Sequence, residues 1–193
     1  KDVRNAVVAA RKAFGGWAEK TAFNRGQILY RIAEMLDGRK AQFVEEIIKQ
    51  GSAKAKAEKE VQQAIDRIVY YAGWADKYQQ IASSVNPVSS SHFNFSALEP
   101  MGVVGIIAPQ ETSLLGLVNF LIPAICGGNA VVVVASQAMP LCAITFAEVI
   151  HTSDVPGGVV NILTGDTDEL ALALASHMDV NAFVSETLGA QQK

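Results

Sequence analysis

One polar segment of this sequence carries residue types that ligand binding and proton transfer require. Pro109-Gln110-Glu111-Thr112-Ser113 follows the apolar run 103–108 and precedes the apolar run 114–126. The first run is typical of a buried strand and the second of a buried helix. In an open α/β sheet, ligands bind at strand-to-helix corners of this kind. Glu111 is therefore a candidate general base. In the alternative that we favour, its carboxylate caps the helix or lies in water.

The cysteines and histidines of the sequence have no catalytic or metal-binding residues beside them at the spacing that such sites require. Cys126 and Cys142 lie in apolar surroundings and form no CxxC pair. This favours core thiols in a reducing compartment over a disulfide framework or a metal site. His151 and His177 fall at or near the ends of expected helices, where the helix dipole favours a cation. We expect no metal site.

A dinucleotide-binding fingerprint is missing from the sequence. No G-x-G-x-x-G stands between a strand and a helix. Gly102 and Gly105 lie within or just before the first expected strand, so we interpret them as turn and close-packing residues. The second expected strand, 130–134, ends without the acid that would hold an adenosine ribose. It leads into Gln137, a neutral amide. The residues alone therefore do not support NAD binding.

The elements that must position these residues follow from the periodicity of apolar positions. Helical spacing dominates residues 1–84, and the first helix is expected to end at Gly15-Gly16. From residue 100 onward, Val/Ile-rich runs alternate with helical patterns. This alternation predicts parallel strands buried on both faces in a Rossmann-like α/β sheet. The expected strands are 103–108, 130–134, 159–163 and 180–184, and the helices between them are 114–126, 140–151 and 167–177.

Residues 85–99 have a different character. They are rich in Ser and Asn, and apolar residues alternate around Phe93 and Phe95. We expect a short β-hairpin or arm with an edge able to pair with another chain. The chain is thus a single domain, 1–193, with a helical part at 1–84, the arm at 85–99 and a βαβ core at 100–193.

Composition limits the possible partners and location. Of the 193 residues, 50% are hydrophobic and 18% are charged, and the formal net charge is -3. A negative balance argues against nucleic acid or an acidic membrane surface as a partner. The longest apolar run, 114–126, is too short to span a bilayer. We expect a cytoplasmic protein.

Four segments together resemble a known family. The sequence contains "EPMGVVGIIAP", "PAICGGNAVVVV", "PGGVVNILTGD" and "SHMDVNAFV", in that order. With the N-terminal "AVVAARKAFGGWAEKTAFNRGQILYRIAEML" and "YYAGWADKY", they resemble the cofactor-binding domain of the aldehyde dehydrogenase superfamily. The resemblance extends over essentially the whole chain. It implies a Rossmann-like domain that binds NAD or NADP beside a separate catalytic domain.

The residues that the resemblance would make functional depart from the family pattern. The family usually has P-W-N-F-P after the first strand, and its Asn donates a hydrogen bond to the reaction oxyanion. Glu111 stands at that Asn position. An ionised carboxylate accepts hydrogen bonds and donates none. Loss of one oxyanion donor typically costs about 10²–10³ in rate.

The cofactor contacts implied by the resemblance are altered as well. The family's second strand ends in K-P-x-E, whose Lys and Glu bind the adenosine ribose. Val134 and Gln137 stand at those two positions. The family's F-T-G-S-T-x-x-G meets the pyrophosphate with its first Gly and its Ser. Ser185 and Glu186 stand there instead, and a carboxylate opposes a pyrophosphate.

These departures favour a degenerate, non-catalytic module. The general base and nucleophilic Cys of the family would lie beyond Lys193, so we expect no catalytic domain in this chain. The closest resemblance is to the truncated second module of family 16 aldehyde dehydrogenases. We expect no cofactor, and self-association, contact with another domain of the same protein, or a protein partner.

In the alternative, the chain is the cofactor half of an active NAD(P)-dependent aldehyde dehydrogenase, and NAD or NADP is then its cofactor. The sequence identifies neither a substrate nor the oligomeric state.

Overall fold

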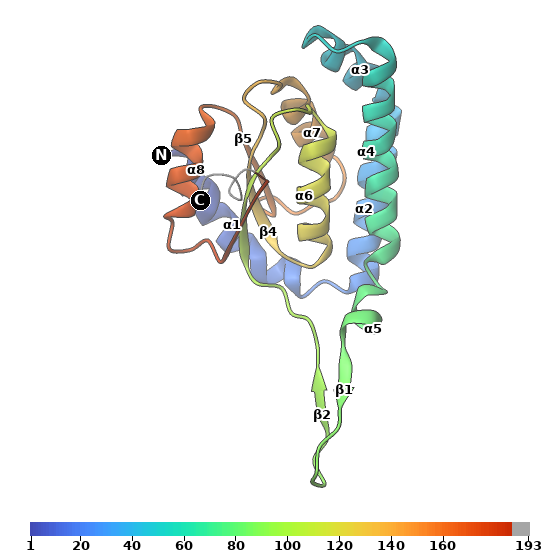
Figure 1. Ribbon diagram of the computed structural model, residues 1–193, viewed down its shortest axis with the longest axis vertical. Helices are drawn as coiled ribbons and strands as arrows, with labels where there is room; N and C mark the ends of the chain where they lie inside the picture. The colour runs from blue at the N-terminus through green and yellow to red at the C-terminus, as the bar shows by residue number, and fades with distance from the viewer. Residues whose placement is uncertain (187–193) are drawn as a thin grey trace.

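Four parallel strands form the sheet at the centre of the computed structural model, which describes residues 1–186 (Figure 1). The strand order is β5-β4-β3-β6. The register pairs Val103 with Ala130 and Ile107 with Val134. The predicted Rossmann-like parallel sheet is therefore confirmed. The strands are β3 (Val103–Ile107), β4 (Ala130–Val134), β5 (Val160–Leu163) and β6 (Ala182–Ser185).

Both faces of the central strands are buried, as the nearly continuous Val/Ile runs predict. Side chains alternate along a strand, so odd and even positions enter different cores. In β3, Val103 and Ile107 pack in one hydrophobic cluster, whereas Val104 and Ile106 pack in the other. Every residue of β3 and β4 is buried.

Helices cover the two faces of the sheet in separate layers. On one face lie α1 (Asp2–Ala18) and α8 (Thr167–Ala175). On the other lie α6 (Leu115–Cys126) and α7 (Leu141–His151). Three further helices pack outside α6 and α7 (Figure 1): α2 (Ala22–Gly38), α3 (Lys40–Lys49) and α4 (Lys54–Trp74).

The first helix does not end where the sequence predicts. We expected the end of the helix at Gly15-Gly16, but α1 continues to Ala18. A glycine inside a helix costs about 1 kcal/mol relative to alanine. Tertiary packing overrides that cost, because the Trp17 side chain is fully buried and its Nε1 donates to the Ile125 carbonyl at 2.9 Å.

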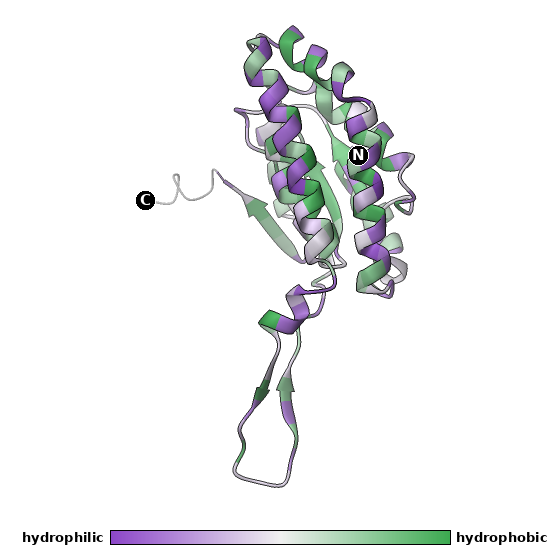
Figure 2. Cartoon of the chain, turned by 90° about the vertical axis from the view of Figure 1, so that its right-hand side faces the viewer, coloured by the Kyte–Doolittle hydropathy of each residue, from purple (hydrophilic) through white to green (hydrophobic). Residues whose placement is uncertain are grey.

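The expected arm is present and projects from the body. After the short helix α5 (Tyr78–Ala82), the strands β1 (Ser84–Asn86) and β2 (Asn94–Ser96) pair antiparallel. Both views show this hairpin extending away from the layered body (Figures 1 and 2). Phe93 is 74% exposed and Phe95 is 63% exposed, and their rings lie 5.6 Å apart. The arm thus presents apolar side chains outside the core.

Two glycines at β3 have the turn and packing roles that the sequence suggests. Gly102 has φ +129°, and a Cβ there would lie 2.2 Å from the Asn181 Oδ1. A Cβ on Gly105 would lie 3.0 Å from the Leu174 side chain of α8. Gly105 therefore allows α8 to pack closely on the sheet. Among residues 1–186, no helix is both long and apolar enough to cross a membrane.

Candidate functional site

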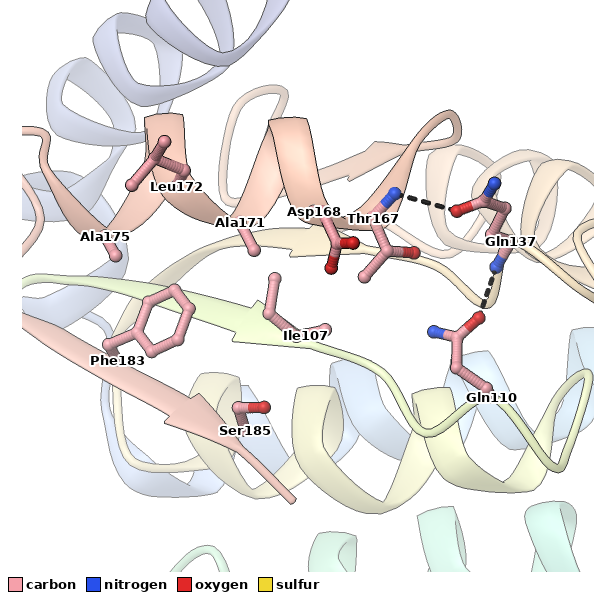
Figure 3. A pocket seen from close by; sticks show the side chains of 10 residues that line it. All are labelled: Ile107, Gln110, Gln137, Thr167, Asp168, Ala171, Leu172, Ala175, Phe183 and Ser185. Carbon is pink, nitrogen blue, oxygen red and sulfur yellow. Dashed lines mark hydrogen bonds between the residues drawn. The ribbon is translucent and has the colours of Figure 1, made fainter. Parts of the chain in front are cut away.

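A hollow of about 550 Å³ lies under α8, beside the carboxyl ends of β3 and β6 (Figure 3). We call it the α8 hollow. Apolar side chains from β3, α8 and β6 form much of its wall, and polar side chains lie toward the strand ends. It is lined by Ile107, Gln110, Gln137, Thr167, Asp168, Ala171, Leu172, Ala175, Phe183 and Ser185. This is the edge of an α/β sheet where ligands bind.

A chain of hydrogen bonds joins three strand-end loops along one side of the α8 hollow. The Gln137 backbone N–H donates to the Gln110 Oε1 at 2.8 Å. The Gln137 Oε1 accepts from the Thr167 backbone N–H at 2.9 Å (Figure 3). The loops after β3, β4 and β5 are thereby held together. Gln137 uses its acceptor oxygen to hold the first residue of α8.

The first turn of α8 is acidic. The Asp166 side chain accepts from the Glu169 backbone N–H at 2.9 Å, which makes Asp166 the N-cap of α8. Asp168 and Glu169 add two more carboxylates, and all three acids are exposed. Among the described residues, no Lys, Arg or His lines the α8 hollow. The negative charge at the N-terminus of α8 therefore comes from the carboxylates of its own first turn.

One polar atom in the lining has no partner. The Thr167 Oγ1 is buried and makes no hydrogen bond within residues 1–186. The backbone N–H of the same residue is bonded to Gln137. Buried hydroxyls are usually hydrogen-bonded, so the unpaired oxygen calls for an explanation.

A buried glutamate that the sequence analysis missed closes the N-terminus of α6. Glu60 on α4 is 5% exposed. Its Oε1 accepts from the backbone N–H groups of Ser113, Leu114 and Leu115 at 3.0, 2.8 and 3.2 Å. The Thr112 Oγ1 accepts a fourth, from Gly116, at 2.9 Å. The amides that make a helix N-terminus an anion site are already occupied here.

Glu111 lies at the corner between β3 and α6, exposed to solvent. Within residues 1–186 it makes no hydrogen bond or ion pair. Glu111 does not cap the helix, because Glu60 and Thr112 supply those acceptors. Its carboxylate lies in water, which is the other half of the alternative that the sequence favoured.

The two cysteines are core thiols. Cys126 and Cys142 are both buried and free. Burial raises the pKa of the Cys126 thiol to about 11 and that of Cys142 to about 12. The carboxylates of Glu46 and Glu60 lie near Cys142 and raise its pKa further. The sequence did not reveal these neighbours, but a thiol with so high a pKa is a poor nucleophile.

The remaining predicted site residues are dispersed. Val134 is fully buried in the sheet and does not line the α8 hollow. Ser185 lines it at the end of β6, and Glu186 follows as an exposed residue. The remainder of that predicted motif, 187–189, lies outside the described residues. Among residues 1–186, no group of three or more His, Cys, Asp or Glu could hold a metal ion.

The structure thus brings together Gln137 and Ser185 at the α8 hollow and adds Gln110, Thr167 and Asp168 to them. The run of acids after Gly165 was a usable signal for Asp168, since carboxylates favour a helix N-terminus. No sequence signal identifies Glu60, because 53 positions separate it from Ser113, to which it is bonded.

The sequence also matches a family model and known proteins. Residues 1–187 match the model of the aldehyde dehydrogenase family. An aldehyde dehydrogenase from Aspergillus niger is 36% identical over 193 residues, covering 97% of this chain and 38% of that protein. Aldehyde dehydrogenase, cytosolic 1, from Elephantulus edwardii is 36% identical over 194 residues, with the same two coverages.

Solved structures agree in fold. The NAD⁺ complex of an aldehyde dehydrogenase from Bacillus cereus has a TM-score of 0.88 at 29% identity, covering 94% of this chain and 37% of that one. The NAD-dependent aldehyde dehydrogenase from Sinorhizobium meliloti also gives 0.88 at 29% identity, covering 94% and 36%. This chain therefore spans between a third and two fifths of the length of these relatives.

Proposed function

The chain belongs to the aldehyde dehydrogenase family, and on that premise we propose that it is a degenerate domain with a structural, assembly or protein-interaction role in a larger protein. The proposed domain binds neither NAD nor NADP and supplies no catalytic residue. Within the family we propose that it is a non-catalytic module like the truncated second module of family 16. The proposed location is the cytoplasm.

The observation that carries this proposal is that the N-termini of α6 and α8, two of the helices at the ligand-binding edge within residues 1–186, are already occupied from within the chain. Glu60 accepts from three successive backbone N–H groups at the start of α6, those of Ser113, Leu114 and Leu115, and Gln137 and Asp166 accept two of α8. Anionic groups such as a pyrophosphate bind helix N-termini through these same amides. A backbone amide that already donates to an acceptor within the chain is not free to donate to a ligand.

The residues at this edge do not fit a dinucleotide in other respects. Val134, where the family has a ribose-binding Lys, is buried and has no polar side-chain atom. Glu111, where the family has the oxyanion donor, is an exposed carboxylate. Asp168 places a further carboxylate on the lining of the α8 hollow. A negatively charged cofactor bound at this edge would be repelled by these carboxylates.

Calorimetric titration with NAD and NADP tests the proposal. We expect no saturable heat from the 193-residue chain with either dinucleotide. The aldehyde dehydrogenase from Bacillus cereus, whose structure is an NAD⁺ complex, serves as the positive control under the same buffer. Micromolar binding of either dinucleotide to this chain would overturn the proposal.

The arm supports the assembly role. Three of its apolar side chains, Val85, Phe93 and Phe95, are each more than 60% exposed. An isolated two-stranded hairpin is marginally stable in water, so a partner surface would stabilise it. We propose that this partner is a second copy of the chain or another domain of the same protein.

Sedimentation velocity distinguishes these partners. If the arm mediates self-association, the wild-type chain sediments as an oligomer and the double variant Phe93→Ser, Phe95→Ser sediments as a monomer. Phe23→Ser removes an equally exposed aromatic ring from α2 and is the matched control. A wild-type chain that stays monomeric over its whole concentration range excludes self-association through the arm.

A second candidate function is the cofactor half of an active NAD(P)-dependent aldehyde dehydrogenase. Two observations favour it: the chain spans about 38% of its relatives, and a hollow persists at the ligand edge. This candidate requires a natural reading frame that continues past Lys193 into a Cys-bearing segment. Aldehyde-dependent reduction of NAD or NADP by that longer protein would establish it, provided that a variant of the new Cys is inactive.

A further inference from the structure

We propose that a pocket beside the root of the arm receives the arm of a second copy of the chain, so that two copies exchange arms. We call it the aromatic pocket. It lies between the C-terminal ends of α4 and α6, and its volume is about 380 Å³. It is lined by Tyr70, Tyr71, Trp74, Tyr78, Pro123, Cys126 and Gly127. This inference rests on the assembly role proposed above and deepens it, because it names the partner and the surface that receives the arm.

The wall of the aromatic pocket suits another aromatic side chain. The Tyr70 ring lies edge-on to Tyr71 with their centroids 5.3 Å apart, and it lies 6.1 Å from Trp74. Tyr70 is 52% exposed, so this cluster is open to a partner. Aromatic rings attract one another in offset and edge-to-face contacts. No Asp, Glu, Lys or Arg is among the described lining residues, so a neutral apolar group fits best.

The polar atoms of the aromatic pocket can bond to the side chains that the arm carries. Within residues 1–186, the Trp74 Nε1 and the hydroxyl groups of Tyr70 and Tyr78 make no hydrogen bond to the protein. Such groups normally find a partner when they are buried. The serines at 89–91 and Asn94 of the arm offer oxygen acceptors. An arm that covers the pocket therefore meets its donors as well as its rings.

The arm lacks the charges that usually keep exposed strands apart. Residues 78–98 contain no Asp, Glu, Lys or Arg. Natural edge strands commonly carry such residues, because the charge prevents pairing with another chain. Phe93 and Phe95 are 74% and 63% exposed, with their rings 5.6 Å apart. The arm thus presents an aromatic pair on a neutral surface, which a partner can cover without burying a charge.

The occupant of the aromatic pocket must come from a second copy. The arm extends away from the layered body in both views, and no described arm residue lines the pocket (Figures 1 and 2). At its root, the Gln79 Nε2 donates to the Leu98 carbonyl at 2.7 Å, which joins α5 to the end of the arm. Two copies related by a two-fold axis place each arm against the root of the other, and the assembly closes as a dimer.

The area of this contact is sufficient for a specific dimer. A buried aromatic side chain contributes roughly 150–250 Å². The exposed parts of Phe93 and Phe95 in both copies, with an equal area of the two pockets, amount to on the order of 1,000 Å². That is the lower limit of stable, specific interfaces, so we expect a dimer that dissociates on dilution.

Sedimentation of a pocket variant tests the exchange without altering the arm. Tyr70→Ala removes a half-exposed ring from the aromatic pocket. We expect it to raise the dissociation constant of the dimer at least about tenfold, as truncation of an aromatic anchor does in other interfaces. Tyr30→Ala removes a ring of similar exposure, 45%, from α2 and is the matched control. It should leave the dissociation constant unchanged.

Disulfide formation between two variants tests the same contact with every aromatic residue in place. Ala82 is exposed on α5, four residues after Tyr78 and on the same helix face. A His92→Cys copy mixed with an Ala82→Cys copy in oxidised glutathione should form a mixed disulfide, which requires the two Cβ atoms to lie about 4 Å apart. Lys12→Cys, exposed on α1, is the matched control and should form none with His92→Cys. Each variant alone reports any link to a native cysteine.

The outcomes separate this inference from the proposed function. A wild-type chain that stays monomeric, a Tyr70→Ala variant that associates as the wild type does, or no link between positions 92 and 82 would each overturn the exchange. Loss of the dimer in the double variant Phe93→Ser, Phe95→Ser but not in Tyr70→Ala would overturn this receiving surface and support the assembly role of the arm. Micromolar binding of NAD would overturn the proposed function, whether or not the arms exchange.

Discussion

The N-termini of α6 and α8 lie at the same edge of the sheet, yet their first backbone N–H groups donate to different kinds of acceptor. At α6 the acceptor is Glu60, a buried carboxylate that comes from the distant helix α4. At α8 the acceptors are Asp166, its own N-cap, and Gln137 from the neighbouring loop, and both are exposed. The backbone amides of α6 are paired through a tertiary contact, and those of α8 are paired through exposed contacts with its own N-cap and a neighbouring loop.

This difference shows which of the two ends can still serve a ligand. A buried carboxylate with three donors is a rigid structural contact, because removing it leaves buried amides without partners. The exposed contacts at α8 leave the α8 hollow open beside them. The α6 end is thus a structural joint, and the α8 end is the part of the edge that remains available for binding.

The largest effect should come from removing the acceptor at α6. Glu60→Ala leaves three backbone N–H groups unpaired, and we expect it to lower the free energy of unfolding by about 3 kcal/mol. Urea unfolding followed by circular dichroism measures this. Glu58→Ala, at an exposed position on the same helix, should change stability by less than about 0.5 kcal/mol. Equal effects of the two variants would contradict the distinction between a buried joint and a surface charge.

The thiol next to the α6 joint should be protected from alkylation. Burial raises the pKa of Cys142 to about 12 from a usual value of 9.0. Since the thiolate is the reactive form, native Cys142 should react with iodoacetamide at least about 100-fold more slowly near pH 8 than in urea.

The raised pKa of Cys142 also makes the free energy of unfolding depend on pH. Because the folded pKa is raised, the stabilising contribution of the neutral thiol is complete below pH 9.0 and is lost as the pH rises toward about 12. Rapid native alkylation of Cys142 at pH 8 would show that the joint opens.

A smaller effect is expected at the α8 end. Gln137→Ala removes the acceptor of the Thr167 N–H, and we expect a loss of about 1 kcal/mol together with faster amide exchange in the first turn of α8. Hydrogen exchange read by NMR separates this local loosening from global destabilisation. Gln27→Ala, at an exposed glutamine on α2, should leave exchange in α8 unchanged.

The smallest effect is expected at Glu111. Glu111→Gln should change the free energy of unfolding by less than about 0.5 kcal/mol, because the side chain is exposed and unbonded within residues 1–186. It should also leave any ligand or partner interaction unchanged. A loss of ligand or partner binding in this variant would instead support a functional role for Glu111.

The layered fold was predictable from the sequence because the apolar runs of its strands indicate burial on both faces. The runs around β3 and β4 are nearly continuous Val/Ile stretches, and the strands begin and end within two residues of the predicted limits. The end of α1 was predicted wrongly, since the burial of Trp17 outweighs two glycines. The candidate site was predicted in part: Gln137 and Ser185 line the α8 hollow, and Val134 does not.

The sequence by itself determined the order of strands and helices and the departures at Glu111, Val134 and Gln137, because periodicity and residue type are local properties. The tertiary structure alone decided which polar groups meet. Glu60 reaches the α6 amides across 53 positions, and Thr167 keeps a buried oxygen unpaired. These contacts depend on how the helices dock on the sheet, and docking is set by packing over the whole core, which residue spacing does not encode.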